Sequence, residues 1–296
     1  MPFTVACAQI APSKAEICAN LDKIADSIRQ AAAESVDLVV FPETSTSGYF
    51  VEGGVLESSL SEEDLGAELA RRLHGLGETI DAAVGFYQKW NGNLYNAVAY
   101  LEISPSGQGS GVRLLRTYRK FFLPTYGLFD EERFVSRGRD LAVFDTRFGR
   151  IALLICEDAW HSILPTLCAV KGAQMLIVPA ASPGRGFSAD TQNPGSKIQN
   201  PENLDRYSRL MRAIAEEHGV YCVNCQLCGF EGGKGFVGGS MVVDPFGKTV
   251  AQGPVNEEYM LIAQVDFDLV QIARAQTPLL SDLQSAWSDI RRIVDE

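Results

Sequence analysis

Short apolar runs of strand length recur along this chain, and they limit its fold more than any other feature. They alternate first with stretches in which apolar residues recur every three or four positions, and later with turns typical of hairpins. Such a mixture of crossovers and hairpins predicts an α/β fold with mixed sheets covered by helices. The predicted strands are 3–10, 37–43, 82–87, 94–102, 113–120, 141–146, 151–156, 175–181, 220–228, 240–252 (a hairpin) and 259–267. The predicted helices are 15–35, 60–76, 160–171, 203–217 and 278–296.

The length of 296 residues, of which 46% are hydrophobic, is enough for one large core. We therefore expect a single domain over residues 1–296, in which 278–296 forms a C-terminal helical tail. The stretch 182–205 is rich in Gly, Pro, Ser and Asn and has little periodicity. It predicts a loop, for which a lid over an active site is one role.

Charge and cysteine content exclude several classes of function. The 37 acidic and 26 basic residues give a net charge of -11, which repels phosphate backbones and anionic lipids, so we expect neither a nucleic-acid nor a membrane partner. No run approaches the roughly 18 to 20 apolar residues of a membrane span, and the first ten residues lack a secretory pattern, so we expect a cytoplasmic protein. The seven cysteines are expected to be reduced thiols.

Cys156 lies where an apolar strand ends and a charged segment begins, a position at which α/β proteins carry reactive groups. A nucleophilic cysteine must be a thiolate, and the ordinary pKa of about 8.5 means that a base or a positive charge has to help. A structural core cysteine is the ordinary alternative. A cysteine–histidine pair has weak support, because none of His74, His161 and His218 ends a comparable strand.

Two more charged residues end predicted strands. Glu43 follows DLVVFP, where partial desolvation favours a role in general acid or base catalysis. Lys120 ends RLLRTYRK and precedes an aromatic loop, where its positive charge could stabilise an anionic intermediate and a thiolate. A solvated carboxylate and a surface lysine are the ordinary alternatives.

Together, Glu43, Lys120 and Cys156 resemble the catalytic triad of the nitrilase superfamily, also called carbon–nitrogen hydrolases, in order, spacing and flanking residues. The resemblance covers nearly the whole chain, since VACAQI, FPE, YRK with LPTYGLFDEERF, LLICED and GGSMVVDPFG all match motifs of that family. It implies a four-layer αββα sandwich with two mixed β-sheets covered by helices.

The resemblance also implies roles for these residues. Glu43 is expected to be the general base, Lys120 to stabilise the oxyanion, and Cys156 to form a thioester with the acyl part of an amide while ammonia or an amine leaves. Glu131, eleven residues after Lys120, matches a second glutamate that assists in this family, and the adjoining Glu132 is the alternative. This chemistry needs no metal and no organic cofactor.

The loop LPTYGLFDEERF and the segment ICEDAW look most similar to the branch that contains the glutaminase domains of NAD synthetases and stand-alone amidases. This similarity assigns Tyr126 and Glu157 to substrate binding, and Glu157 replaces the tryptophan that follows the nucleophile in nitrilases proper. We expect Trp160 and the loop that begins at Ser182 to shape the pocket. Members of the family pair through helices, so the resemblance implies a homodimer or a larger homo-oligomer.

Several functions remain open. Hydrolysis of a small linear amide is the leading one, and the alternatives are an N-carbamoyl amide hydrolase, a stand-alone glutaminase subunit that feeds a synthetase, and a catalytically silent binding or regulatory module. The chain lacks a Gly-rich ATP-pyrophosphatase motif, so we do not expect a complete NAD synthetase.

Two motifs that could suggest other functions are weak. The pattern G-x-G-x-x-G at 233–238 precedes a strand, whereas a dinucleotide site would open a helix. Cys222, Cys225 and Cys228 alternate between the two faces of a predicted strand, so they favour core packing over a metal site.

Overall fold

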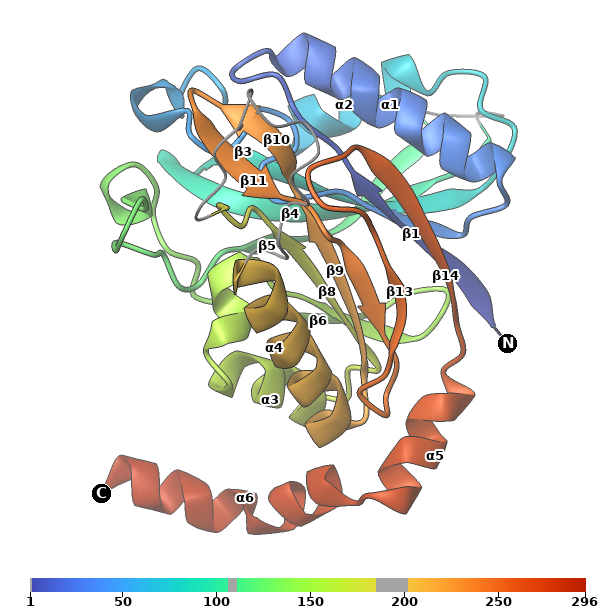
Figure 1. Cartoon of the computed structure of the whole chain (residues 1–296), viewed down its shortest axis with the longest axis vertical. Coiled ribbons are helices and arrows are strands. Elements are labelled where there is room, and N and C mark those ends of the chain that lie inside the picture. The colour runs from blue at the N-terminus through green and yellow to red at the C-terminus, as the bar shows by residue number, and fades with distance from the viewer. Residues whose placement is uncertain (1, 106–110, 185–201) are drawn as a thin grey trace, which may run out of the picture.

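In the computed structural model, which describes residues 2–105, 111–184 and 202–296, two six-stranded mixed sheets lie face to face (Figure 1). The first sheet, in spatial order, contains β14 (Tyr259–Val265), β1 (Phe3–Gln9), β2 (Leu38–Val40), β3 (Ile80–Trp90), β4 (Asn93–Ile103) and β5 (Val112–Arg119). The second contains β13 (Thr249–Gln252), β12 (Met241–Val243), β9 (Tyr221–Gln226), β8 (Met175–Ala180), β7 (Arg150–Leu153) and β6 (Ala142–Asp145). A separate hairpin is formed by β10 (Cys228–Glu231) and β11 (Lys234–Val237).

Side chains that alternate along the strands explain the two layers of core. In β1, Val5 and Cys7 belong to the core between the sheets, whereas Ala6 and Ala8 belong to the core beneath the helices. Successive side chains of a strand point to opposite faces, so a strand that is apolar on both faces must be covered on both. The apolar runs in the sequence follow from this burial.

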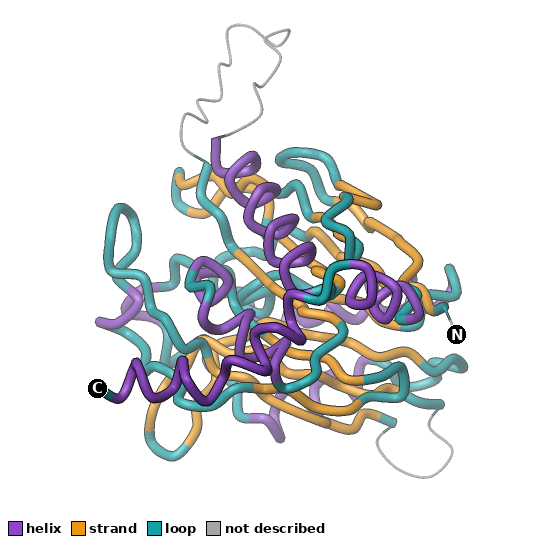
Figure 2. Tube along the Cα trace, turned by 90° about the horizontal axis from the view of Figure 1, so that it is seen from below, coloured by secondary structure: helices purple, strands orange, loops and turns teal. Residues whose placement is uncertain are grey.

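Helices cover the outer face of each sheet, as Figures 1 and 2 show. The first sheet is covered by α1 (Ile17–Ala33) and α2 (Glu62–Arg72), and the second by α3 (Ile163–Val170) and α4 (Glu202–His218). At the start of α2, Ser61 and Asp64 form a reciprocal capping box that pairs the first free amides of the helix. The layers are helix, sheet, sheet and helix, which confirms the predicted αββα sandwich.

Two helices end the chain. The last, α6 (Leu279–Asp295), lies within the segment 278–296, contacts α3 and α4, and buries its Leu280 side chain. The preceding helix, α5 (Asp268–Gln276), was not predicted, since the segment between the predicted strand 259–267 and the predicted helix 278–296 was assigned to no element. None of the helices in the described ranges is long and apolar enough to span a bilayer.

Several predicted boundaries differ from the structure, and two of the differences lie near the site. The run 220–228 is not one strand, since β9 ends at Gln226 and Cys228 begins β10. The predicted loop 182–205 ends earlier than expected, because α4 begins at Glu202, where acidic residues of the first turn favour the positive end of the helix dipole. Residues 185–201 of that loop lie outside the described residues.

Candidate active site

Glu43 lies just beyond the end of β2, in a turn that packs against β3. The hydroxyl of Ser45 donates to the Gly85 carbonyl at 2.9 Å, and the Thr46 amide donates to the same oxygen. A Cβ atom on Gly85 would lie 2.8 Å from the Thr44 nitrogen and closer still to the Pro42 carbonyl oxygen. Because Gly85 has no side chain, this turn can approach β3 closely, and the Glu43 carboxyl is held inside the protein.

Lys120 follows β5 directly, and its side chain is fully buried between two carboxyls. Its Nζ lies 2.7 Å from Oε1 of Glu43 and 2.8 Å from Oε1 of Glu131. Glu131 opens a short 3-10 helix over Glu131–Arg133, and its side chain is only 5% exposed, whereas Glu132 faces solvent. Of the two glutamates considered from the sequence, the folded chain brings Glu131 to the lysine.

Cys156 stands at a sharp turn between β7 and a short 3-10 helix over Cys156–Trp160. Its φ is +45°, a left-handed backbone conformation that costs a residue with a side chain about 1 to 3 kcal/mol and that recurs at functional sites. Its Sγ lies 3.1 Å from the hydroxyl of Tyr207 on α4, and the residue is 7% exposed. The turn thus presents one thiol at the end of the second sheet.

Asp158 ties the cysteine turn to the lysine loop. Its carboxyl accepts hydrogen bonds from the Tyr118 hydroxyl at 2.8 Å and from the Ile155 amide at 3.1 Å. The amides of Phe121 and Phe122, next to Lys120, also donate to it, at 3.1 and 2.8 Å. Burial raises the pKa of Asp158 to about 7, against these donors and Lys120. One carboxyl therefore fixes the spacing between two segments that carry site residues.

The electrostatics of the cluster favour a neutral thiol at rest. Burial raises the pKa of Cys156 well above its usual range, the Glu43 carboxylate raises it further, and Lys120 lowers it. Burial opposes the charge on Lys120, but Glu131 and Glu43 outweigh it and raise the pKa of the ammonium group. Burial also raises the pKa of Glu131, against the effect of Lys120. A thiol in this setting needs a base before it can attack.

A cavity opens at Cys156, and all four side chains that the sequence assigned to substrate binding line it. They are Tyr126, Glu157, Trp160 and Ser182. The Tyr126 hydroxyl donates to Oε2 of Glu157 at 2.8 Å, and Trp160 packs edge-on against Tyr207 with ring centroids 5.0 Å apart. Arg206 also lines the cavity, so the cavity presents the carboxylate of Glu157 and the guanidinium group of Arg206.

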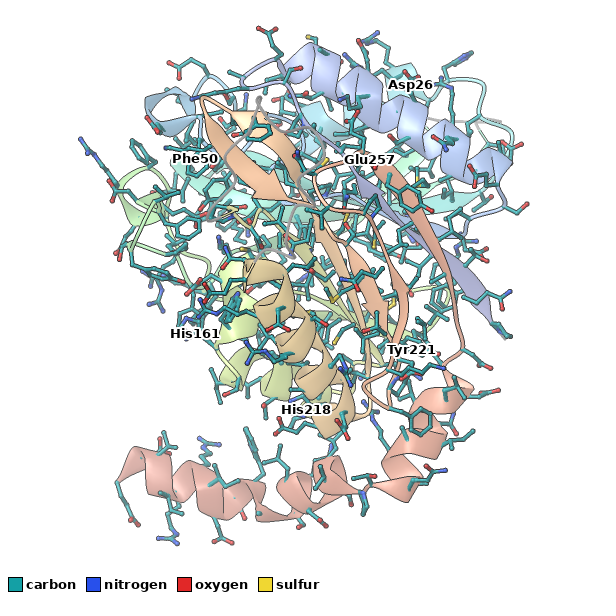
Figure 3. All side chains as sticks on the ribbon, viewed as in Figure 1. Asp26, Phe50, His161, His218, Tyr221 and Glu257 are labelled. Atoms are coloured by element: carbon teal, nitrogen blue, oxygen red, sulfur yellow. The ribbon has the colours of Figure 1, made fainter. Side chains whose placement is uncertain are left out.

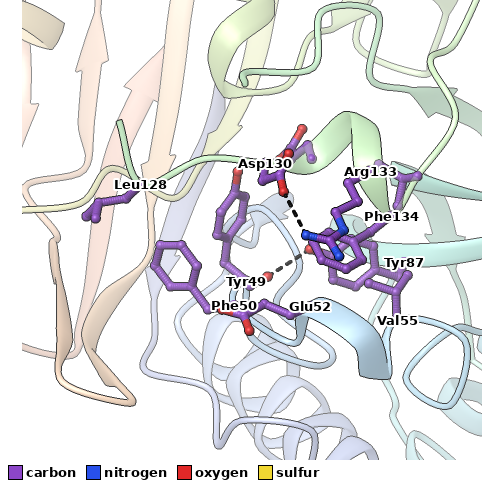
Figure 4. Close-up of a pocket in the computed structure, with 11 residues that line it drawn as sticks. Tyr49, Phe50, Glu52, Val55, Tyr87, Leu128, Asp130, Arg133 and Phe134 are labelled. Atoms are coloured by element: carbon purple, nitrogen blue, oxygen red, sulfur yellow. Dashed lines mark hydrogen bonds and ion pairs between the residues drawn. The ribbon is translucent and has the colours of Figure 1, made fainter. Parts of the chain in front are cut away.

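A second cavity, shown in Figure 4, is lined by Glu131, one of the two carboxyls that flank Lys120. Tyr49, Tyr87 and Glu131 contribute to its walls, and the Tyr87 hydroxyl donates to the Tyr49 carbonyl at 2.8 Å. Cys156 therefore lines one cavity, and Glu131 lines the other.

The histidines do not pair with the thiol. His161 stacks on Phe122 with ring centroids 3.7 Å apart, and its Nε2 lies 3.6 Å from Oε1 of Glu157. His218 is buried at the C-terminal end of α4, where its Nε2 lies 3.3 Å from the Thr166 hydroxyl on α3 (Figure 3). His74 faces solvent. Among the described residues, no group of three or more His, Cys, Asp or Glu side chains is arranged to hold a metal ion.

Sequence reasoning missed Asn96, Asp158 and Tyr207. The position of Asn96 could have been noticed in the sequence, because a polar residue stands there on the same face of β4 as the core residues Val98 and Tyr100. No such feature marks Tyr207, since only the packing of α4 brings it to the thiol.

Comparison with known proteins identifies the family of this chain. The family model of the carbon-nitrogen hydrolases matches residues 4–275. The chain is 29% identical over 266 residues to the glutamine-dependent NAD(+) synthetase of Thermotoga maritima, covering 89% of this chain and 42% of that protein.

Two solved structures share the fold. The glutamine-dependent NAD+ synthetase of Acinetobacter baumannii has a TM-score of 0.76 at 25% identity, over 91% of this chain and 47% of that one. A member of branch 10 of the nitrilase superfamily from Saccharomyces cerevisiae has a TM-score of 0.73 at 25% identity, over 94% and 95% of the two chains. The chain thus spans less than half of the NAD synthetases and nearly all of the yeast protein, and it belongs to the carbon-nitrogen hydrolase family of the nitrilase superfamily.

Proposed function

We propose that this protein hydrolyses a linear amide through a thioester on Cys156, with Glu43 as general base and Lys120 as oxyanion stabiliser. The observation that carries the proposal is the buried Lys120 ammonium group between two carboxyls, within electrostatic reach of the raised-pKa thiol of Cys156. A thiol that is neutral at rest requires a base, and a buried cation favours negative charge as it develops.

The steps follow from these groups. Glu43 takes the thiol proton, the sulfur attacks the amide carbon, and the oxyanion is held by Lys120 and nearby backbone amides. The intermediate collapses, the C–N bond breaks, and the leaving amine takes the proton that Glu43 holds, which leaves an acyl thioester on Cys156 and an ionised Glu43. Glu43 then accepts a proton from water as the water attacks the thioester, and it returns that proton to the departing sulfur, so that the acid product and the Cys156 thiol are released.

A substrate that carries both an ammonium and a carboxylate group suits the cavity, because Glu157 and Arg206 both line it. Similarity to a protein named as a glutamine-dependent synthetase makes glutamine the first amide to test. Under this second form of the proposal the chain acts as a glutaminase, whose ammonia a synthetase would consume.

The test measures ammonia released by the wild type and by Cys156→Ala. The panel contains glutamine, asparagine, simple aliphatic amides, N-carbamoyl amino acids and nitriles. Cys18→Ala is the matched control, because Cys18 is an exposed free cysteine on α1. We expect the wild type and the control to release ammonia from an amide and Cys156→Ala to release none. Equal release by all three proteins would refute Cys156 as nucleophile, and a preference for N-carbamoyl compounds would favour the alternative hydrolase.

A further inference from the structure

Asn96 contacts every charged member of the buried cluster around Lys120. It lies on β4 and is fully buried. Its Nδ2 atom donates to Oε1 of Glu43 at 2.7 Å and to Oε1 of Glu131 at 3.1 Å. Its backbone carbonyl accepts a hydrogen bond from the Lys120 amide at 2.8 Å. A single residue thus holds the lysine by its main chain and both glutamates by its side chain.

The donors of Asn96 and Lys120 converge on the same two oxygens. Oε1 of Glu43 and Oε1 of Glu131 each accept one hydrogen bond from Nζ of Lys120 and one from Nδ2 of Asn96, which closes a ring of four polar atoms. Hydrogen bonds from charged or polar donors favour the ionised form of a carboxyl and disfavour a proton on the oxygen that accepts them. Within the described residues, Oε2 of Glu43 is buried and accepts no hydrogen bond.

We propose that Asn96 is a positioning residue, which fixes Oε1 of both glutamates and leaves Oε2 of Glu43 as the atom that takes the Cys156 proton. This inference rests on the proposed hydrolase function. An asparagine suits the position because its amide supplies two donors without adding charge, whereas an aspartate of the same size would supply acceptors and a third negative charge.

The ionisable groups around the pair are few. Besides Lys120, they are the Cys156 thiol and the phenols of Tyr49 and Tyr87. Burial, Glu131 and Glu43 raise the pKa of both phenols, so the phenols stay neutral. Asp158 also interacts electrostatically with Lys120. The phenols and the thiol are neutral at neutral pH, so the charge balance is set by the Lys120 ammonium group, the carboxyls of Glu43 and Glu131, and Asp158.

The experiment compares Asn96→Ala and Asn96→Asp with the wild type, and uses Asn93→Ala as the matched control. Asn93 is an exposed asparagine at the start of β4, three residues before Asn96, and its side chain hydrogen-bonds to the Asn91 carbonyl and the Ser136 hydroxyl at the surface, away from the buried cluster. Circular dichroism establishes that each variant is folded. The first readout is kcat and KM for the best amide as a function of pH.

We expect kcat to fall about 10- to 100-fold in Asn96→Ala, as for the loss of a hydrogen bond to a charged group, with little change in KM. The acid limb of the rate profile should move to higher pH, because the carboxyl pair loses donors that favour its ionised form. Asn96→Asp should be affected more at neutral pH, although it keeps the size of the side chain. Asn93→Ala should match the wild type.

The second readout needs no amide substrate. Iodoacetamide labelling is followed peptide by peptide by mass spectrometry, with the exposed Cys18 as internal reference. We expect labelling of Cys156 to slow about 10-fold or more in Asn96→Ala and Asn96→Asp, with unchanged labelling of Cys18.

The two proposals fail separately. If Cys156-dependent ammonia release is present but folded Asn96 variants keep the wild-type kcat, pH profile and labelling rate, the positioning role is wrong and the hydrolase function stands. If the wild type releases no ammonia from any amide, the proposed function fails, and the labelling rate alone accepts or rejects the role of Asn96.

Discussion

Replacement of Lys120 by methionine tests whether the buried ammonium group holds two carboxyls that would otherwise repel each other. Methionine is similar in length and apolar, so Lys120→Met removes the charge and leaves Glu43 and Glu131 facing one another in the core. Removal of one partner from a buried ion pair costs about 3 to 5 kcal/mol. Domains are stable by about 5 to 15 kcal/mol, so a large part of the free energy of unfolding should be lost.

The loss should depend on pH in a defined direction. The pKa of Glu131 is already raised by burial, and without the lysine it rises further in the folded state. A carboxyl whose pKa is higher in the folded state than in the unfolded state contributes stability at low pH. This contribution is lost as the pH rises from the unfolded pKa to the folded pKa, by about 1.4 kcal/mol per pH unit. The deficit of Lys120→Met should therefore be larger at about pH 8 than at about pH 5.5.

The assay is urea unfolding at both pH values, followed by circular dichroism. The double variant Lys120→Met with Glu131→Gln should recover much of the loss at high pH, because it removes one of the two opposed charges. Lys89→Met is the control, since Lys89 pairs with Asp64 at the surface and should cost about 0 to 1 kcal/mol. A deficit below about 1 kcal/mol, or one equal at both pH values, would refute this account of the cluster.

Three further substitutions test how the site is built. Gly85→Ala should displace the turn that carries the proposed base, lower the melting temperature and reduce amide hydrolysis at least tenfold. The control Gly66→Ala has open space around its Cα and should cost nothing or stabilise its helix by about 0.5 to 1 kcal/mol, so equal melting temperatures for the two variants would contradict the role of Gly85. Asp158→Ala leaves buried backbone amides without an acceptor and should cost about 3 kcal/mol or more in urea unfolding, and a loss under about 1 kcal/mol would show that water replaces the carboxyl. Tyr207→Phe removes a hydroxyl that lowers the pKa of Cys156, so iodoacetamide labelling near pH 8 should slow about fivefold, and an unchanged rate would mean that the hydroxyl does not donate to the sulfur.

Much of the site was visible along the chain because its members stand at strand ends. Glu43 and Cys156 each follow an apolar run, which itself shows that the strand is buried, whereas Lys120 follows a strand with alternating basic and apolar residues. Glu131 could only be separated from Glu132 by the fold, because adjacent residues of a short helix point in different directions and one of them is exposed. Similarly, the cavity at Cys156 gathers Tyr126 and Ser182 from segments that no local pattern connects.

Period and composition are local properties, so they were sufficient for the strands, most of the helices and the class of fold, and the order of motifs was sufficient for the family. The ring of hydrogen bonds around Lys120 required the folded chain, because its four members come from different strands and loops. The raised pKa of Cys156 likewise depends on burial and on charges that are close in space but distant in sequence. Desolvation and Coulomb interaction depend on distance and surroundings in three dimensions, which no pattern of neighbouring residues contains.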